Sequence, residues 1–284
     1  MADLLITSPT NPRLKHVLAL RRRRARDAAG QTLVEGFDEL TLALVGGFVP
    51  QTLYVCPELF SPSGYAGTQA IGRQDDLVAK VRAAGTLVVR LSRAAFERVA
   101  YREGPDGLLG VVGSVERRLD TLAVPERPLV LVVEGVEKPG NLGAMLRTAD
   151  AAGVDAVVAV DAATDWGNPN VVRASKGTVF TVPVAAAGLE ATVGWCASHG
   201  IPLVVTTPKA DRLHTDVDYA GPVAVVVGAE NHGASEGLLS AADALVRIPM
   251  AGRVNSLNVA SAAAVVLYEA VRQRASKRLR DRGL

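Results

Sequence analysis

The chain of 284 residues has few of the residues that mark several protein classes. Its only cysteines are Cys56 and Cys196, which excludes a disulfide framework and a zinc site built from clustered thiolates. Aromatic residues make up 4% of the sequence, so valine, leucine and alanine must fill the core. No stretch approaches the roughly 18 uninterrupted apolar residues of a membrane helix, and the beginning lacks the pattern of a secretory signal. We therefore expect a cytoplasmic protein with no membrane contact.

The formal net charge of +2 conceals two basic ends. Residues 1–30 contain seven basic and two acidic residues, and residues 271–284 contain six basic residues and one acidic residue. The middle of the chain is acidic. Basic ends on an acidic body indicate a polyanionic partner such as nucleic acid, although charge blocks of this kind are also common on exposed helix faces and tails.

The chain divides into two regions of different pattern. Residues 1–113, the first predicted domain, mix helical and strand patterns, and residues 114–128 are a polar, proline-containing linker. In residues 129–284, near-continuous valine and leucine runs alternate with helical patterns, which predicts a buried parallel sheet in an α/β domain. The predicted strands of this second domain are residues 129–136, 155–160, 181–185, 201–206, 222–228 and 244–250.

Helices are predicted in both regions. The first region is expected to contain a helix around 11–29, strands at 52–57 and 86–91, and a helix at 75–84 between them. In the second region, Gly153 is expected to end the first helix as a left-handed C-terminal residue. The helices predicted there are residues 141–153, 189–199, 235–242 and 256–274.

Three glycine-containing turns follow predicted strands and open helices. They are EKPGNLG (137–143), GAENHGAS (228–235) and MAGRVNSLN (250–258). Ligands on open α/β sheets bind beyond the carboxyl ends of the strands, so these turns are the candidate site. Polar side chains gather in and just beyond them, although each also has an ordinary structural role, such as helix capping or solvent exposure.

Familiar nucleotide and hydrolase motifs do not fit these turns. GAENHGAS lacks the lysine of a phosphate-binding loop, and no GxGxxG follows a strand. The four histidines have no metal-ligand spacing, and no GxSxG elbow is present. The sequence therefore disfavours ATP or GTP hydrolysis, dinucleotide binding, a metal site and serine hydrolase chemistry.

Taken together and in order, the three turns and their helices closely resemble the three signature segments of the SpoU/TrmH family. The segments are EKPGNLGAMLRTADAAG, VVVGAENHGAS and IPMAGRVNSLNVASAAAVVLYE. Members of this family, part of the SPOUT superfamily, are RNA ribose 2′-O-methyltransferases that use S-adenosylmethionine. NPNVVRASKGTVFTVPV (168–184) resembles the segment between the first two signatures. TSPTNPRLK, LVEGFDEL and GPDGLLGVV are similar to the small substrate-binding domain found ahead of many members.

The resemblance implies a fold, an assembly and an activity. The fold would be α/β, with a trefoil-knotted SPOUT methyltransferase domain preceded by a smaller, ribosomal-protein-like α/β domain that binds the RNA substrate. The protein would be a homodimer with active sites at the subunit interface, and it would need no metal. The activity would be 2′-O-methylation of 23S ribosomal RNA. Alternatives are a tRNA ribose methyltransferase, a non-catalytic RNA-binding factor that retains the fold, and a nucleotide-binding regulator.

The resemblance also assigns residues to roles. The residues on active-site positions are Asn141, Arg147, Glu230, Ser256 and Asn258. The residues expected to contact S-adenosylmethionine are Thr206, Gly228, Ile248 and Leu257. Because a guanidinium is effectively always charged, we expect Arg147 to hold a phosphate and lower the pKa of the ribose hydroxyl, and Glu230 to hold either Arg147 or the turn. From the charge distribution, the residues expected to contact RNA phosphates are Arg13, Lys15, Arg21, Arg22, Arg23 and Arg24.

Overall fold

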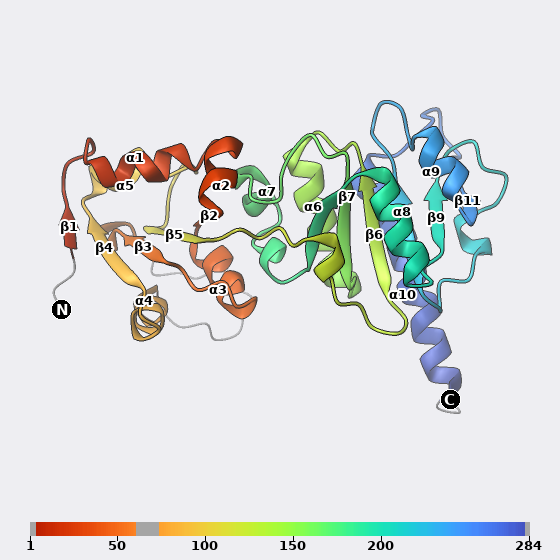
Figure 1. Ribbon diagram of the computed structural model, residues 1–284, viewed down its shortest axis with the longest axis horizontal. Coiled ribbons are helices and arrows are strands. Elements are labelled where there is room, and N and C mark those ends of the chain that lie inside the picture. Colours follow the sequence, from red (N-terminus) through yellow and green to blue (C-terminus); the bar gives the residue numbers. More distant parts are fainter. Residues whose placement is uncertain (1–3, 61–73, 282–284) are drawn as a thin grey trace. The chain divides into compact units, whose positions relative to one another are not determined.

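The structure, a computed structural model, describes residues 4–60 and 74–281 of the chain. The chain forms two compact units (Figure 1). The first contains the residues up to Val115 together with Gly167–Thr181, and the second contains Glu116–Trp166 and the residues from Val182 onward. Each unit has its own β-sheet, so the predicted α/β class is confirmed. None of the helices in the described ranges is long and apolar enough to cross a membrane.

The first unit has a mixed five-stranded sheet in the order β1-β4-β3-β5-β2. Its strands are β1 (Leu4–Ile6), β2 (Gln31–Glu35), β3 (Thr52–Val55), β4 (Leu87–Leu91) and β5 (Leu108–Gly113). β4 is parallel to β1 and β3, whereas β5 is antiparallel to β2 and β3. Its helices include α1 (Pro12–Ala19), α2 (Arg23–Ala29), α3 (Phe37–Val45), α4 (Gln74–Ala83), α5 (Arg93–Val99) and the 3-10 turn η1 (Pro57–Leu59). The strands and the helix predicted at 52–57, 86–91 and 75–84 are thus present as β3, β4 and α4.

The prediction of one helix around 11–29 is wrong, because the chain breaks between α1 and α2. Arg22 has an extended backbone, with φ −98° and ψ 134°. Arg26, only 4% exposed, donates from its guanidinium to the carbonyl oxygens of Leu20 and Arg21, both at 3.0 Å. These hydrogen bonds from a buried arginine satisfy two carbonyl groups at the end of α1 and so stabilise the break. Helical periodicity in the sequence does not reveal such a contact.

An excursion of the chain, Gly167–Thr181, folds with the first unit. It contains α7 (Pro169–Ala174), which packs against β2, and the 3-10 turn η3 (Thr178–Phe180), which packs against α3. Gly177 has φ +85°, and a Cβ there would lie 2.8 Å from the Cα of Glu39. The aromatic rings of Phe48 and Phe180 pack edge to face at 5.4 Å. In sequence the excursion lies within the predicted domain 129–284, and those domain boundaries stay a prediction.

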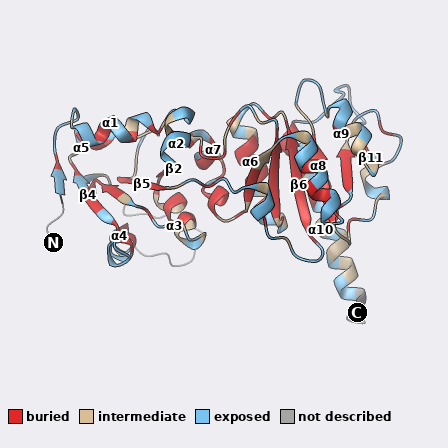
Figure 2. Ribbon diagram, viewed as in Figure 1, coloured by how far each residue is buried: buried red, intermediate tan, exposed pale blue. Residues whose placement is uncertain are grey.

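The second unit has a six-stranded sheet in which all pairs are parallel, as predicted. The strand order is β11-β9-β10-β6-β7-β8. The strands are β6 (Leu129–Glu134), β7 (Ala156–Val160), β8 (Val184–Ala187), β9 (Leu203–Thr206), β10 (Val223–Val227) and β11 (Ala244–Val246). All residues of β6, β7 and β10 are buried, which explains why these strands are continuous apolar runs (Figure 2).

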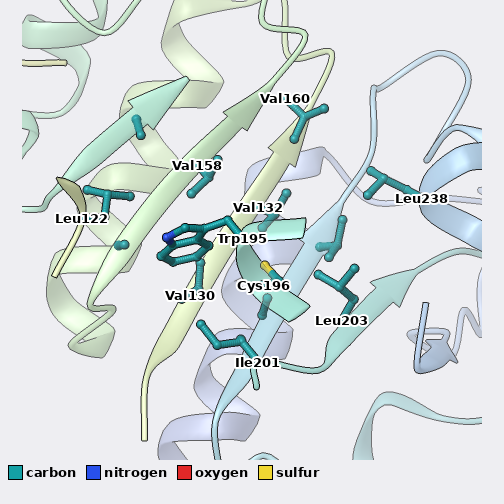
Figure 3. Packing of buried hydrophobic residues seen from close by; sticks show 14 of the residues in the cluster. Leu122, Val130, Val132, Val158, Val160, Trp195, Cys196, Ile201, Leu203 and Leu238 are labelled. Atoms are coloured by element: carbon teal, nitrogen blue, oxygen red, sulfur yellow. The ribbon is translucent and has the colours of Figure 1, made fainter. Parts of the chain in front are cut away.

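Helices complete the second unit on the two faces of this sheet. Its helical elements are α6 (Pro139–Ala152), α8 (Leu189–Ser198), α9 (Glu236–Ala241), α10 (Val259–Asp281) and the 3-10 turns η2 (Leu119–Thr121) and η4 (His214–Asp216). Trp195 and Cys196 of α8 and Leu238 of α9 pack in one core cluster with alternate strand residues such as Val130 and Val132 (Figure 3). α10 packs against α6 and β10. Gly153 ends α6 with φ +67°, as predicted.

Because all six strands are parallel, their carboxyl ends lie at one edge of the sheet. The turns that follow β6, β10 and β11 therefore emerge at this edge, and β6 and β10 are direct neighbours. The sheet brings the first of these turns together with the second and third, which begin about 90 and about 110 residues further along the chain.

Candidate active site

The first turn connects β6 to α6. β6 ends at Glu134, which is 7% exposed. The next residue, Gly135, has a left-handed φ of +60°. α6 begins at Pro139, where a proline is favourable because the first helical residue needs no hydrogen bond from its nitrogen. Lys138 is the residue before the helix, so Asn141 lies within the first helical turn rather than at the N-cap.

The second turn connects β10 to α9 and forms a closed loop. The backbone of Ala229 and that of Gly233 exchange two hydrogen bonds, of 3.0 and 2.9 Å. A Cβ at Gly228 would overlap the backbone of Gly233 and Ala234, so glycine is required where the loop folds back. Ser235 then caps α9, its hydroxyl accepting from the N–H of Leu238 at 3.3 Å.

Side chains and backbone tie the first turn to the second. The Lys138 ammonium donates to Glu230 Oε2 at 2.6 Å, and this pairing raises the pKa of Lys138. The buried carboxylate of Glu134 accepts the N–H of Ser235 at 2.7 Å. A Cβ at Gly135 would lie 3.2 Å from that of Ala229. The two turns are therefore joined by two hydrogen-bonded contacts and lie close together at Gly135 and Ala229.

The third turn, between β11 and α10, joins the first through two asparagines. Asn258 Oδ1 accepts the N–H of Ala260 at 2.9 Å and so caps α10. The amide nitrogen of Asn258 donates to Asn141 Oδ1 at 3.2 Å. Asn141 Nδ2 is buried and has no hydrogen-bond partner among the described residues. Residues 251–258 are all exposed.

Comparison with known proteins places this geometry in a family. Residues 128–268 match the model of the SpoU rRNA Methylase family, and residues 11–110 match an MRM3-like substrate binding domain. A 23S rRNA (guanosine-2′-O-)-methyltransferase, RlmB, of Ralstonia nicotianae is 39% identical over 210 residues, covering 71% of this chain and 83% of that protein. The chain belongs to the SpoU methylase family.

Two further relatives cover nearly the whole chain. The 23S rRNA (guanosine(2553)-2′-O)-methyltransferase RlmP of Bacillus subtilis is 30% identical over 93% of this chain and 97% of its own length. The crystal structure of an AdoMet-bound rRNA methyltransferase from Sinorhizobium meliloti matches with a TM-score of 0.83 at 31% identity, covering 94% of this chain and 97% of that one. The predicted family membership is confirmed.

The structure brings three of the five residues expected at the active site to one place. Asn141 and Asn258 share a hydrogen bond, and Glu230 reaches the same helix start through Lys138. Of the two roles expected for Glu230, this ion pair corresponds to holding the turn rather than Arg147. Arg147 and Ser256 are exposed, and neither side chain has a hydrogen bond or ion pair within residues 4–60 and 74–281.

Three of the four residues expected at the cofactor lie at or just beyond the carboxyl ends of neighbouring strands. Thr206 ends β9 and donates its hydroxyl to the carbonyl oxygen of Val226 at 2.9 Å. Gly228 follows β10, and Ile248 follows β11 by two residues. Leu257 lies on the third turn and is 39% exposed. Thr206 thus has a structural hydrogen bond, while Leu257 offers apolar surface to a ligand.

Sequence reasoning missed two residues at this site, Glu134 and Lys138. Glu134 is the single acidic residue that ends the apolar run of β6, and Lys138 directly precedes the proline of α6. An acid that closes a buried strand needs a partner, which was the available signal. The identity of that partner depends on which strand lies beside β6, and the local sequence does not contain this.

The basic residues expected at RNA differ in their surroundings. Arg13, Lys15, Arg22, Arg23 and Arg24 are exposed on α1, α2 and their junction. Arg21 instead donates to the carbonyl oxygens of Val99 and Ala100, at 3.1 and 2.6 Å, and its guanidinium lies 5.6 Å from the centre of the Tyr101 ring. Arg21 therefore stabilises the fold, whereas the other five are accessible to a polyanion.

Proposed function

We propose that this chain transfers a methyl group from S-adenosylmethionine to the 2′-hydroxyl of a ribose in 23S ribosomal RNA. The observation that carries the proposal is the convergence of three SpoU-type turns, tied by the Asn141–Asn258 and Lys138–Glu230 contacts. Family membership supports it, as does the printed activity of the RlmB and RlmP relatives.

The residues at the three turns fit S-adenosylmethionine. The buried, unpartnered Nδ2 of Asn141 can donate a hydrogen bond to a polar group of a ligand. The exposed side chain of Leu257 provides apolar surface, and the glycine-containing second turn provides backbone groups. We assign cofactor binding to Thr206, Gly228, Ile248 and Leu257.

The chemistry requires alignment and removal of one proton. S-adenosylmethionine supplies a methyl group on a sulfonium, which leaves as a neutral thioether. The protein must place the ribose oxygen in line and favour loss of the hydroxyl proton. Arg147, exposed and unpaired within the described ranges, binds the neighbouring phosphate, and its fixed charge lowers the pKa of the hydroxyl, whose proton leaves to that phosphate or to a water. Asn141 and Asn258 fix the two turns, and Ser256 orients the ribose hydroxyl.

The first unit binds the RNA substrate. Its match to a substrate-binding domain model and its five exposed cations, at 13, 15 and 22–24, support this role. Such contacts neutralise phosphates and position the RNA without specifying its sequence. The excursion Gly167–Thr181 is part of the folded unit and therefore part of this module.

The active assembly is a homodimer, and the second unit is a trefoil knot, as expected for the family. Apolar side chains exposed on α10 and the third turn support the dimer, because a partner subunit would cover this apolar surface. Val254 is 64% exposed, Val265 38% and Tyr268 51%. A cytoplasmic location stays a prediction.

The test is to map 2′-O-methylation across total RNA from cells with and without the protein. We expect that one nucleotide of 23S ribosomal RNA lacks its 2′-O-methyl group in the cells without the protein. Loss in a tRNA would favour the alternative substrate, and no loss would favour a non-catalytic RNA-binding factor. A thermal-shift comparison of S-adenosylmethionine with ATP separates the methyltransferase from a nucleotide-binding regulator.

A further inference from the structure

The turn after β6 holds the turn after β10 at both ends of its loop. At the far end of the loop, the carboxylate of Glu134 accepts the N–H of Ser235 at 2.7 Å. Near its beginning, Lys138 pairs with Glu230 at 2.6 Å. Gly135 also lies close to Ala229, which precedes Glu230 at the base of the loop. Glu134 and Lys138 are four residues apart on one turn, yet they contact opposite ends of the other.

The loop between these ties is closed on itself. The two backbone hydrogen bonds between Ala229 and Gly233 close it, and the tight fold at Gly228 removes freedom at its base. A closed loop attached at two points has a fixed orientation, whereas one attached at a single point can rotate about it. The position of Gly228 and Glu230 therefore depends on both ties.

The two ties differ in strength for a physical reason. Glu134 is buried, so its charge-assisted hydrogen bond is poorly screened, and loss of the acceptor leaves the Ser235 N–H unpaired. The Lys138 side chain is 71% exposed, and ion pairs with exposed partners contribute little. Glu134 is the main anchor and Lys138 the lesser one.

We propose that Glu134 and Lys138 are positioning residues, which hold the β10–α9 turn in the place where it binds S-adenosylmethionine. This inference rests on the proposed function, because it assumes that the turn contacts this cofactor. Neither residue touches the reacting atoms in this assignment. Their effect is on cofactor affinity through the loop, and not on RNA affinity, which we assign to the first unit.

The experiment compares Glu134→Ala with Glu134→Gln, which keeps an acceptor oxygen. The matched control is Asp155→Ala, because Asp155 Oδ2 accepts the N–H of Leu129 at 2.8 Å, at the opposite end of the same strand. Titration calorimetry with S-adenosylmethionine and a filter-binding assay with ribosomal RNA are run on each full-length variant. Hydrogen exchange at the Ser235 amide, without cofactor, reports on the loop itself.

The expected results separate positioning from general destabilisation. Glu134→Ala should bind S-adenosylmethionine at least tenfold more weakly and exchange the Ser235 amide faster, while RNA affinity stays within twofold. The affinity for S-adenosylmethionine should stay within threefold of the wild-type value in Glu134→Gln and within twofold in Asp155→Ala. If Glu134→Ala does not fold, Lys138→Met is the second variant, with an expected two- to fourfold loss that Lys138→Arg restores.

Two outcomes would overturn the inference alone: wild-type cofactor affinity in folded Glu134→Ala, or an equal loss in Asp155→Ala. Where Lys138→Met is the variant used, unchanged cofactor affinity would overturn it too. A wild-type protein that does not bind S-adenosylmethionine in the same titration would instead refute the proposed function, and the positioning role with it.

Discussion

Asn258 performs two tasks that substitutions can separate. Its Oδ1 caps α10 through the N–H of Ala260, and its Nδ2 donates to Asn141 in the first turn. Asn258→Ala removes both contacts, Asn258→Asp keeps an acceptor for the cap but loses the donor, and Asn258→Ser caps with a side chain too short to reach Asn141. All three variants therefore lose the hydrogen bond to Asn141, but only Asn258→Asp and Asn258→Ser keep the helix cap.

The expected stability changes follow from the cap. Replacing a capping asparagine with alanine costs about 1 kcal/mol, and the lost hydrogen bond to Asn141 adds about 0.5–1 kcal/mol. Aspartate and serine are good capping residues, so these two variants should lose no more than about 1 kcal/mol. Urea unfolding of all three against the wild type measures these differences.

Activity should depend on the hydrogen bond between Asn258 and Asn141 and not on the helix cap. Because small misplacements of aligned groups can cost about 100-fold in rate, we expect all three variants to lose at least about tenfold in kcat/KM for methyl transfer. Tritium transfer from labelled S-adenosylmethionine to ribosomal RNA is the assay. Activity near wild type in Asn258→Ser, with Asn258→Ala impaired, would show that the cap matters and the tie to Asn141 does not.

Three further predictions concern the rest of the molecule. Arg274 donates to four backbone carbonyls, at 2.7–3.1 Å, in the segments that precede β6 and β10, so Arg274→Lys should lower the free energy of unfolding in urea by about 2–3 kcal/mol. Burial raises the pKa of Glu35 to about 7 from 4.5, so the folded state binds a proton that the unfolded state releases, and stability should fall as pH rises between these values. Glu35→Gln should remove this loss, which is about 3 kcal/mol in full, when unfolding is compared at pH 5 and pH 7.5. Replacing Arg22, Arg23 and Arg24 with glutamine should weaken RNA binding and reduce the slope of log affinity against log salt by up to about 2, without changing cofactor affinity; an unchanged slope would remove these arginines from the RNA surface.

The sheet of the second unit is predictable from sequence because burial on both faces leaves a direct pattern. β6 and β10 are continuous apolar runs, and five of the six predicted runs contain a strand; the run predicted at 181–185 is placed too early, because β8 spans Val184–Ala187. The break between α1 and α2 is different, because it depends on Arg26 folding back onto two carbonyls. The packing of the excursion Gly167–Thr181 on the first unit likewise depends on tertiary contacts such as Phe48 with Phe180.

The candidate site also contains some residues that the sequence predicts and others that it does not. Asn141 and Asn258 are accessible to sequence analysis because they belong to recognisable segments, and the structure places them in hydrogen-bonding contact. Glu134 and Lys138 act on partners about 100 residues away, across neighbouring strands that are first and fifth along the chain in this sheet. Contacts between such distant residues depend on which strands are neighbours in the sheet, and the spacing of nearby residues in the sequence does not indicate this.

The site separates the groups that set geometry from those available for chemistry. Glu134 is buried and holds the N–H of Ser235, and Asn141 accepts a hydrogen bond from Asn258, whereas Arg147 and Ser256 are exposed and their side chains form no hydrogen bond or ion pair within residues 4–60 and 74–281. A transfer whose leaving group departs neutral needs alignment more than it needs a strong acid. In the proposed mechanism, the contacts between the turns exist before substrate arrives, and RNA then binds at Arg147 and Ser256. Changes to these contacts should therefore lower cofactor affinity in the absence of RNA, and changes to Arg147 should affect only the step in which RNA takes part.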